Sequence, residues 1–154
     1  MRKRTFEFQC PRCGKTFSMV RDTLLLRGSI GPEYERLKTN GFFLHQCQNC
    51  HQVFPLQYPL IYRDVEQKFS ILLTEQKKVD MLPEGRSILC RNSEEFLFAF
   101  HCLDAGQDVG RILRLQKSIS EKERQEMKLK DIDPAARVAV FQSENKEVLV
   151  RLPE

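Results

Sequence analysis

The sequence predicts an α+β fold, in which a zinc-ribbon β-lobe with an inserted helix is followed by a small α/β lobe that ends in a β-hairpin. Three observations predict this class. Two Cys-x-x-Cys pairs, Cys10/Cys13 and Cys47/Cys50, lie within the first fifty residues. The stretches that flank them alternate apolar and polar residues, as strands do. Apolar residues at helical spacing follow in the second half of the chain.

Composition changes predict two lobes and a linker. Residues 75–85 are polar and contain Pro83 and Gly85, as linkers and loops often do. We therefore expect a ribbon lobe at residues 1–76, a linker at 77–86, and a helical lobe with a C-terminal hairpin at 87–154.

The ribbon lobe is expected to be mostly β-structure. Its strands are predicted at residues 5–9, 15–20, 42–46, 58–62 and 68–73. The inserted helix is expected to begin at Gly31-Pro32-Glu33, because proline suits the first helical position and acids suit the first turn. Asn40-Gly41 is expected to end it.

The second lobe is expected to contain both helices and strands. Predicted elements are a strand at 87–91, a helix at 94–105, a helix from Asp108 to about residue 117, a charged helix at 120–130, and hairpin strands at 137–142 and 147–152. Ser120, with Glu123 three residues later, resembles the start of the charged helix.

Composition limits the classes of protein. The chain has 154 residues, of which 41% are hydrophobic and 30% charged, as is ordinary for a globular protein. It has no apolar run of about 18 residues, so no membrane span or membrane partner is expected. The basic start, residues 1–4, is followed by no apolar segment, so a secretory signal is not expected either. We therefore expect a cytoplasmic protein whose cysteines are metal ligands or free thiols.

The four paired cysteines predict a metal centre. A two-residue gap lets both thiolates of a pair reach one ion, and two pairs complete a tetrahedral Cys₄ set. Cys10, Cys13, Cys47 and Cys50 are therefore expected to bind one Zn²⁺ per chain in a structural role, since no position remains for water or substrate. Iron is the alternative, because rubredoxin-type sites also use Cys-Pro-x-Cys-Gly.

Other uses of these residues fit less well. Cys47-Gln48-Asn49-Cys50-His51 matches a haem-attachment pattern, but haem attachment would require export and would leave Cys10 and Cys13 without a role. A redox dithiol needs a strand–motif–helix context, which neither pair has. Cys102 follows His101, but neighbouring helical residues diverge and do not face each other. With no catalytic motif, we expect the protein not to be an enzyme.

Positive charge is concentrated in the first half of the chain. Residues 1–64 hold ten Lys and Arg against five Asp and Glu, whereas residues 65–154 hold fifteen against sixteen. Arg12 at the tip of the first cysteine pair, together with Arg2, Lys3 and Arg4, is the candidate partner-binding set. A protein partner is expected. The alternative is a nucleic-acid-binding ribbon linked to transcription or RNA, whose binding would weaken steeply with salt.

Three stretches resemble the CpXC domain family: Phe8-Gln9-Cys10-Pro11-Arg12-Cys13-Gly14, then Cys47-x-x-Cys50, then Tyr58-Pro59-Leu60-Ile61-Tyr62-Arg63-Asp64. The resemblance covers roughly residues 5–130 and extends to the final hairpin. It implies the ribbon fold, the cysteine ligands and a bacterial or archaeal setting, and it implies no activity. Gln48 and His51 stand where the family commonly has proline and glycine, so the second turn is expected to be looser.

Overall fold

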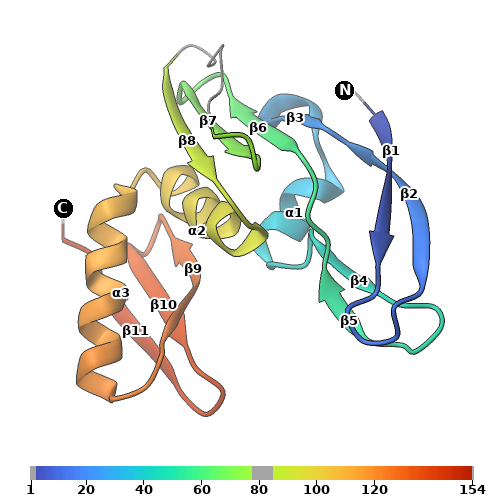
Figure 1. The fold of residues 1–154 in the computed structure, drawn as a ribbon. Coiled ribbons are helices and arrows are strands. Elements are labelled where there is room, and N and C mark those ends of the chain that lie inside the picture. The colour runs from blue at the N-terminus through green and yellow to red at the C-terminus, as the bar shows by residue number, and fades with distance from the viewer. Residues whose placement is uncertain (1–2, 78–84, 154) are drawn as a thin grey trace. The chain divides into compact units, whose positions relative to one another are not determined.

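The computed structural model describes residues 3–77 and 85–153 and has a mixed α+β fold (Figure 1). The α+β class predicted from the sequence is therefore confirmed. Among the described residues, no helix combines the length and the apolar character needed to cross a membrane. In chain order the elements are β1 (Lys3–Gln9), β2 (Thr16–Asp22), β3 (Leu24–Leu26), the 3₁₀ turn η1 (Arg27–Ser29), α1 (Pro32–Lys38), β4 (Leu44–Gln46), β5 (Val53–Pro55), β6 (Leu60–Asp64), β7 (Phe69–Leu73), β8 (Arg86–Cys90), α2 (Ser93–Asp104), α3 (Val109–Glu123), β9 (Lys128–Asp133), β10 (Val138–Gln142) and β11 (Glu147–Arg151).

The chain divides into two compact units, Met1–Phe96 and Leu97–Glu154. This boundary differs from the expected linker at 77–86, of which residues 78–84 lie outside the described part. The strand expected to open the second lobe, β8, instead pairs in parallel with β7 and belongs to the first unit's sheet. Residues 86–90 therefore belong to the first unit, because their backbone pairs with the buried strand β7.

The first unit contains a four-stranded sheet in the order β3-β6-β7-β8 and two separate two-stranded hairpins, β1-β2 and β4-β5. Every residue of β7 is buried, as its apolar residues around Ser70 suggest, whereas β6 alternates buried and half-buried residues. An aromatic cluster lies beside the sheet: the ring of Phe43 is 6.0 Å from that of Tyr58 and 5.4 Å from that of Phe96.

The inserted helix α1 begins at Pro32, as the sequence predicted, and buries Leu37 completely. Asn40, with φ 66°, turns the chain out of it. The following strand is shorter than expected. Phe42 and Phe43 precede β4 and are buried in the core.

The second unit is a three-stranded antiparallel sheet in the order β11-β10-β9 with α3 packed on it. The Asp108 carboxylate accepts a hydrogen bond from the Arg111 backbone (3.0 Å) at the start of α3. One buried cluster joins the helix to the sheet and includes Ile112, Ile119, Met127, Ile132, Ala139 and Phe141.

The separate charged helix expected at residues 120–130 is wrong. Helix α3 continues through Ser120 to Glu123, and Arg124, with φ 56°, ends it. The Ser120 hydroxyl does not cap a new helix but accepts a hydrogen bond from the Met127 backbone (3.0 Å). Strand β9 follows. Its two apolar residues packed in the core, Leu129 and Ile132, are three residues apart, because the pairing with β10 shifts register between Val140 and Phe141, so simple alternation does not mark this strand.

Candidate metal centre

The first cysteine turn follows β1 directly. The Cys10 backbone N–H donates to the Lys15 carbonyl (3.0 Å), and the Gly14 N–H donates to the Cys10 carbonyl (2.9 Å). Gly14 has φ 76°, a left-handed conformation that glycine adopts without strain. These bonds fold the chain back into β2 and direct the Cys10 and Cys13 side chains to one side of the turn.

The second cysteine turn, between β4 and β5, repeats this geometry. The Cys47 N–H donates to the Gln52 carbonyl (2.8 Å), and the His51 N–H donates to the Cys47 carbonyl (2.8 Å). His51, with φ 64°, takes the left-handed position that Gly14 holds in the first turn. The expectation of a looser second turn is wrong, because the histidine adopts the same conformation and both hydrogen bonds are kept.

The repeat extends to the residues that flank each turn. Gln9 and Gln46 each precede the first cysteine of a pair, and each donates its side-chain amide to the carbonyl five residues later, of Gly14 (3.1 Å) and His51 (3.2 Å) respectively. We call these two bonds the glutamine clamps. Sequence reasoning missed them, although both turns share the string Gln-Cys-x-x-Cys at a constant offset of 37 residues.

Aromatic rings hold the two hairpins together next to the cysteines. Phe17 of β2 stacks on His45 of β4, with ring centroids 4.7 Å apart and planes inclined by 23°. Phe8 lies 5.7 Å from Phe17, and Phe54 lies 5.7 Å from His45. These four residues occupy equivalent places in the two hairpins, so the repeat forms its own small core. It fixes the two cysteine turns relative to each other.

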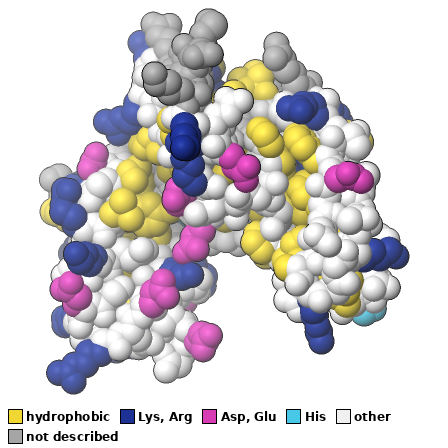
Figure 2. Space-filling view, viewed as in Figure 1, with side chains coloured by type: hydrophobic (Ala, Val, Ile, Leu, Met, Phe, Trp, Pro, Cys, Tyr) yellow, Lys and Arg dark blue, Asp and Glu magenta, His cyan; other side chains and the backbone are white. Residues whose placement is uncertain are grey.

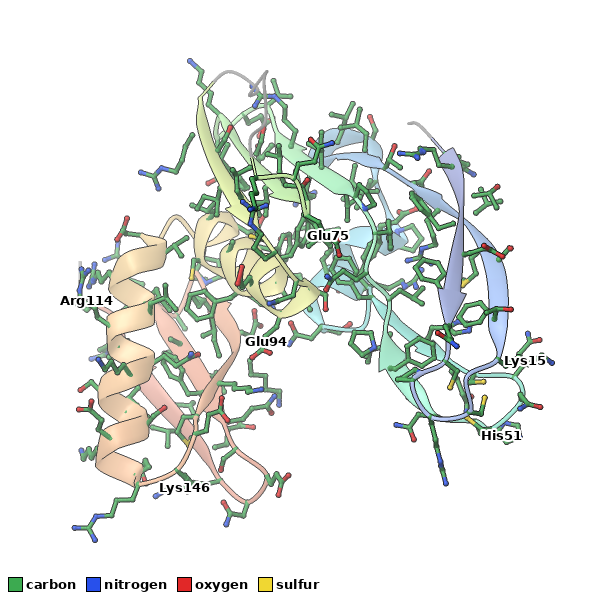
Figure 3. The ribbon with its side chains drawn as sticks, in the orientation of Figure 1. Lys15, His51, Glu75, Glu94, Arg114 and Lys146 are labelled. Carbon is green, nitrogen blue, oxygen red and sulfur yellow. The ribbon has the colours of Figure 1, made fainter. Side chains whose placement is uncertain are left out.

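The structure brings the four predicted cysteines together (Figure 3), with Lys15 and His51 at the tips of the hairpins beside the sulfur atoms. All four Sγ atoms lie within 4.8 Å of one another. The Cys10–Cys50 and Cys13–Cys47 sulfurs are 3.5 and 3.7 Å apart. A tetrahedron with metal–sulfur bonds of about 2.3 Å has edges of about 3.8 Å. All four cysteines are free, and these separations suit a shared ion rather than a disulfide.

The surroundings of the sulfurs shift their protonation. The Asn49 side-chain amide donates to Cys13 Sγ (3.5 Å), and this bond, with one from the Lys15 backbone, lowers the pKa of Cys13 to about 6. At Cys50 a hydrogen bond from the Gln52 backbone lowers the pKa, but loss of solvation and the neighbouring thiols outweigh it and raise the pKa to about 11. The centre therefore contains thiols of unequal acidity.

These pKa shifts predict how many protons a metal ion displaces. Near pH 7.5 Cys13 is already a thiolate and releases no proton on metal binding, whereas near pH 5 its thiol is mostly protonated and releases one, because its pKa is about 6. Metal binding should therefore release about one proton fewer near pH 7.5 than near pH 5. Calorimetry in buffers of different ionisation enthalpy measures this number. An equal count at both pH values would contradict the lowered pKa of Cys13.

The glutamine clamps should contribute measurably to stability. Each replaces a water contact with one partly exposed hydrogen bond, so we expect Gln9→Ala and Gln46→Ala each to reduce the free energy of unfolding by about 0.5–1 kcal/mol. Gln48→Ala is the matched control, because Gln48 is an exposed residue at the second tip. Chemical denaturation of the metal-loaded protein measures the effect, and equal stabilities for all three variants would show that the clamps contribute nothing.

The candidate partner-binding residues do not form one surface. Arg12 lies exposed at the tip of the first hairpin, while Lys3 and Arg4 lie at the far end of β1. Six residue steps along the strand separate that end from the cysteine turn by about 20 Å. Arg2 lies outside the described residues.

The other two cysteines, Cys90 and Cys102, are not part of this cluster, and both are buried. Burial, the largest cause, raises the pKa of Cys90 and of Cys102 to about 12 in each case, so both remain thiols at neutral pH. His101, next to Cys102, is also buried, and its Nδ1 lies 3.2 Å from the Asp131 carboxylate. This contact directs the imidazole to β9.

Fold and site together define a mixed α+β protein with a cysteine cluster that could hold a metal ion. The sequence matches the CpXC protein family over residues 32–147, which is most of the chain, and the protein belongs to that family. The matched range contains Cys47 and Cys50 and begins after the first cysteine turn. Neither the curated proteins nor the solved structures gave a significant match.

Proposed function

We propose that Cys10, Cys13, Cys47 and Cys50 bind one zinc ion, and that the resulting zinc ribbon is a structural scaffold for binding another protein. The single observation that carries this proposal is the packing of four thiols within 4.8 Å, at separations close to a tetrahedron's edge. Two hairpins that each supply a Cys-x-x-Cys turn have the form of a zinc ribbon.

The donor set supports a structural rather than a catalytic role. A catalytic zinc keeps one coordination position for water or substrate, whereas four protein thiolates fill every position. The remaining cysteines are buried thiols with a raised pKa and are poor nucleophiles. We therefore propose that the protein is not an enzyme.

Charge around the centre favours a protein partner over nucleic acid. Four thiolates and one Zn²⁺ carry a net charge of about −2. Arg12 and Lys15 are the only Lys, Arg, Asp or Glu residues within the two turns, residues 10–15 and 47–52. They offset the charge of the centre and leave little positive potential at the tips to attract phosphates.

An exposed apolar face lies on the second hairpin. Leu44 and Val53 are each 50% exposed and project on the same side of β4 and β5, opposite His45 and Phe54. A rigid, uncharged face of this kind suits a protein contact better than a phosphate backbone.

Capture of partners from the lysate of the native host, with and without nuclease, tests the proposal. The wild-type bait should retain a protein partner after nuclease treatment, and the variant Leu44→Ser/Val53→Ser should lose it. Val65→Ser is the matched control, since Val65 is 64% exposed in the turn after β6. All baits should contain the same amount of zinc, which shows that the ribbon is intact.

The other outcomes separate the alternatives. The alternative, a nucleic-acid-binding ribbon linked to transcription or RNA, predicts a different pattern. Its partners would be lost after nuclease treatment, at high salt, and when the bait is the double variant Arg12→Gln/Lys15→Gln. Partners retained equally by all variants, or no partner at all, would contradict the scaffold role of the second hairpin.

A further inference from the structure

A cavity of about 620 Å³ lies in the first unit, away from the cysteines. It is bordered by the inner face of β1, the start of β3 and β6, and the chain that leaves β7. Aliphatic side chains, among them Leu24, Ile61 and Leu72, line one part of it, and polar and charged residues line the rest. Figure 2 shows hydrophobic side chains reaching the surface in the region of β3 and β6, with Lys or Arg side chains nearby.

Two arginines lie at this cavity. Strand alternation places Arg4 on the same face of β1 as Phe6, whose ring packs 5.4 Å from that of Tyr58. The Arg4 guanidinium lies 5.2 Å from the Phe6 ring, and within the described part of the chain it has no acidic partner. Arg91 donates to the carbonyls of Thr74 (3.0 Å) and Gln76 (2.5 Å) and is held in place.

The charges and the volume define what would fit. The lining has a net charge of +1, from Arg4, Arg91 and Glu75, and this charge complements a ligand with a single negative charge. Glu75 would repel phosphates that carry several charges. At about 30 Å³ per atom, as for water, the cavity has room for about twenty non-hydrogen atoms.

We propose that this cavity binds a small amphipathic monoanion, an aliphatic carboxylate, with its chain against Leu24, Ile61 and Leu72 and its carboxylate paired with Arg4. Burial of the chain provides affinity, and the guanidinium, which can pair with a carboxylate through two hydrogen bonds, selects the head group. No cysteine lines the cavity, so the ligand would not contact the cysteine centre.

Calorimetric titration of the full chain with decanoate, kept below its micelle concentration, tests this proposal. We expect saturable binding with one site per chain, and at least tenfold weaker binding of the uncharged analogue decanol. Arg4→Gln should weaken decanoate binding at least tenfold and leave decanol binding unchanged. Lys15→Gln is the control, because it removes one positive charge from the same unit at the hairpin tip.

Zinc content and the far-ultraviolet circular dichroism spectrum verify that each variant is folded. The proposal is overturned if decanoate does not bind at millimolar concentration, if decanol binds equally well, or if Arg4→Gln and Lys15→Gln weaken binding equally. That last result would mean that only the overall charge of the protein attracts the carboxylate.

Discussion

Cys13→Ser should cause the protein to lose its metal ion and should destabilise the first unit severely. Structural zinc contributes on the order of 10 kcal/mol to the folding of small domains, and a site that lacks one thiolate retains only part of this. We expect the melting temperature of the first unit to fall by more than about 10 °C. Differential scanning calorimetry of the zinc-loaded proteins measures this shift.

The exposure of Cys13 makes this test specific. Substitution of an exposed side chain with no special role usually changes stability by no more than about 0.5 kcal/mol. Cys90→Ala, at a buried thiol away from the centre, should leave the metal content unchanged. With a strong chelator present, wild type and Cys13→Ser should melt together. A shift that persists in the chelator would mean that Cys13 stabilises the fold without a metal ion.

Gly85→Ala should be the most damaging of the glycine substitutions. Gly85 has φ +94°, and a Cβ there would lie 2.3 Å from the Lys68 carbonyl oxygen. That oxygen also accepts the hydrogen bond from the Arg86 backbone (3.1 Å) that begins the pairing of β8 with β7. The clash and the unfavourable φ together should cost about 3 kcal/mol of the free energy of unfolding, measured by chemical denaturation.

Gly28→Ala is the matched control for Gly85→Ala. A Cβ at Gly28 would meet no atom within 4 Å, and its φ is not left-handed. We expect this variant to be as stable as wild type, or more stable by about 0.5 kcal/mol, because alanine restricts the unfolded chain. An equal decrease in the free energy of unfolding in the two variants would show that the close approach to Lys68 is not the reason why residue 85 must be glycine.

The sequence was sufficient to predict the cysteine cluster and three of the four strands that flank its turns, but not the short strand β5. Cys-x-x-Cys spacing is a local constraint, and the alternation of Phe6 and Phe8 marks β1 without reference to the rest of the chain. The glutamine clamps were also present in the sequence as a repeat, but a single Gln before a cysteine has many uses. Only the matching hydrogen bonds to Gly14 and His51 show that the two are equivalent.

Other features depend on tertiary contacts and could not be predicted locally. Strand β8 resembles the start of a second lobe until its register with β7, Phe69 opposite Arg86, assigns it to the first unit. The charged stretch at 120–130 has good helix formers throughout, yet pairing with β10 makes residues 128–133 a strand. The prediction of a looser second turn failed at His51. A left-handed φ is uncommon for histidine, but the hydrogen bonds of the turn hold the residue in that conformation.

Metal analysis of the purified protein, by native mass spectrometry together with elemental analysis, tests whether the four cysteines bind a metal ion. We expect one zinc ion per chain, bound to cysteine thiolates and absent from Cys13→Ser. One iron ion per chain would support metal binding by the four cysteines but would show that the metal is iron rather than zinc. Less than about half an equivalent of any metal, in protein purified without chelators and reconstituted with zinc, would contradict metal binding by these four cysteines.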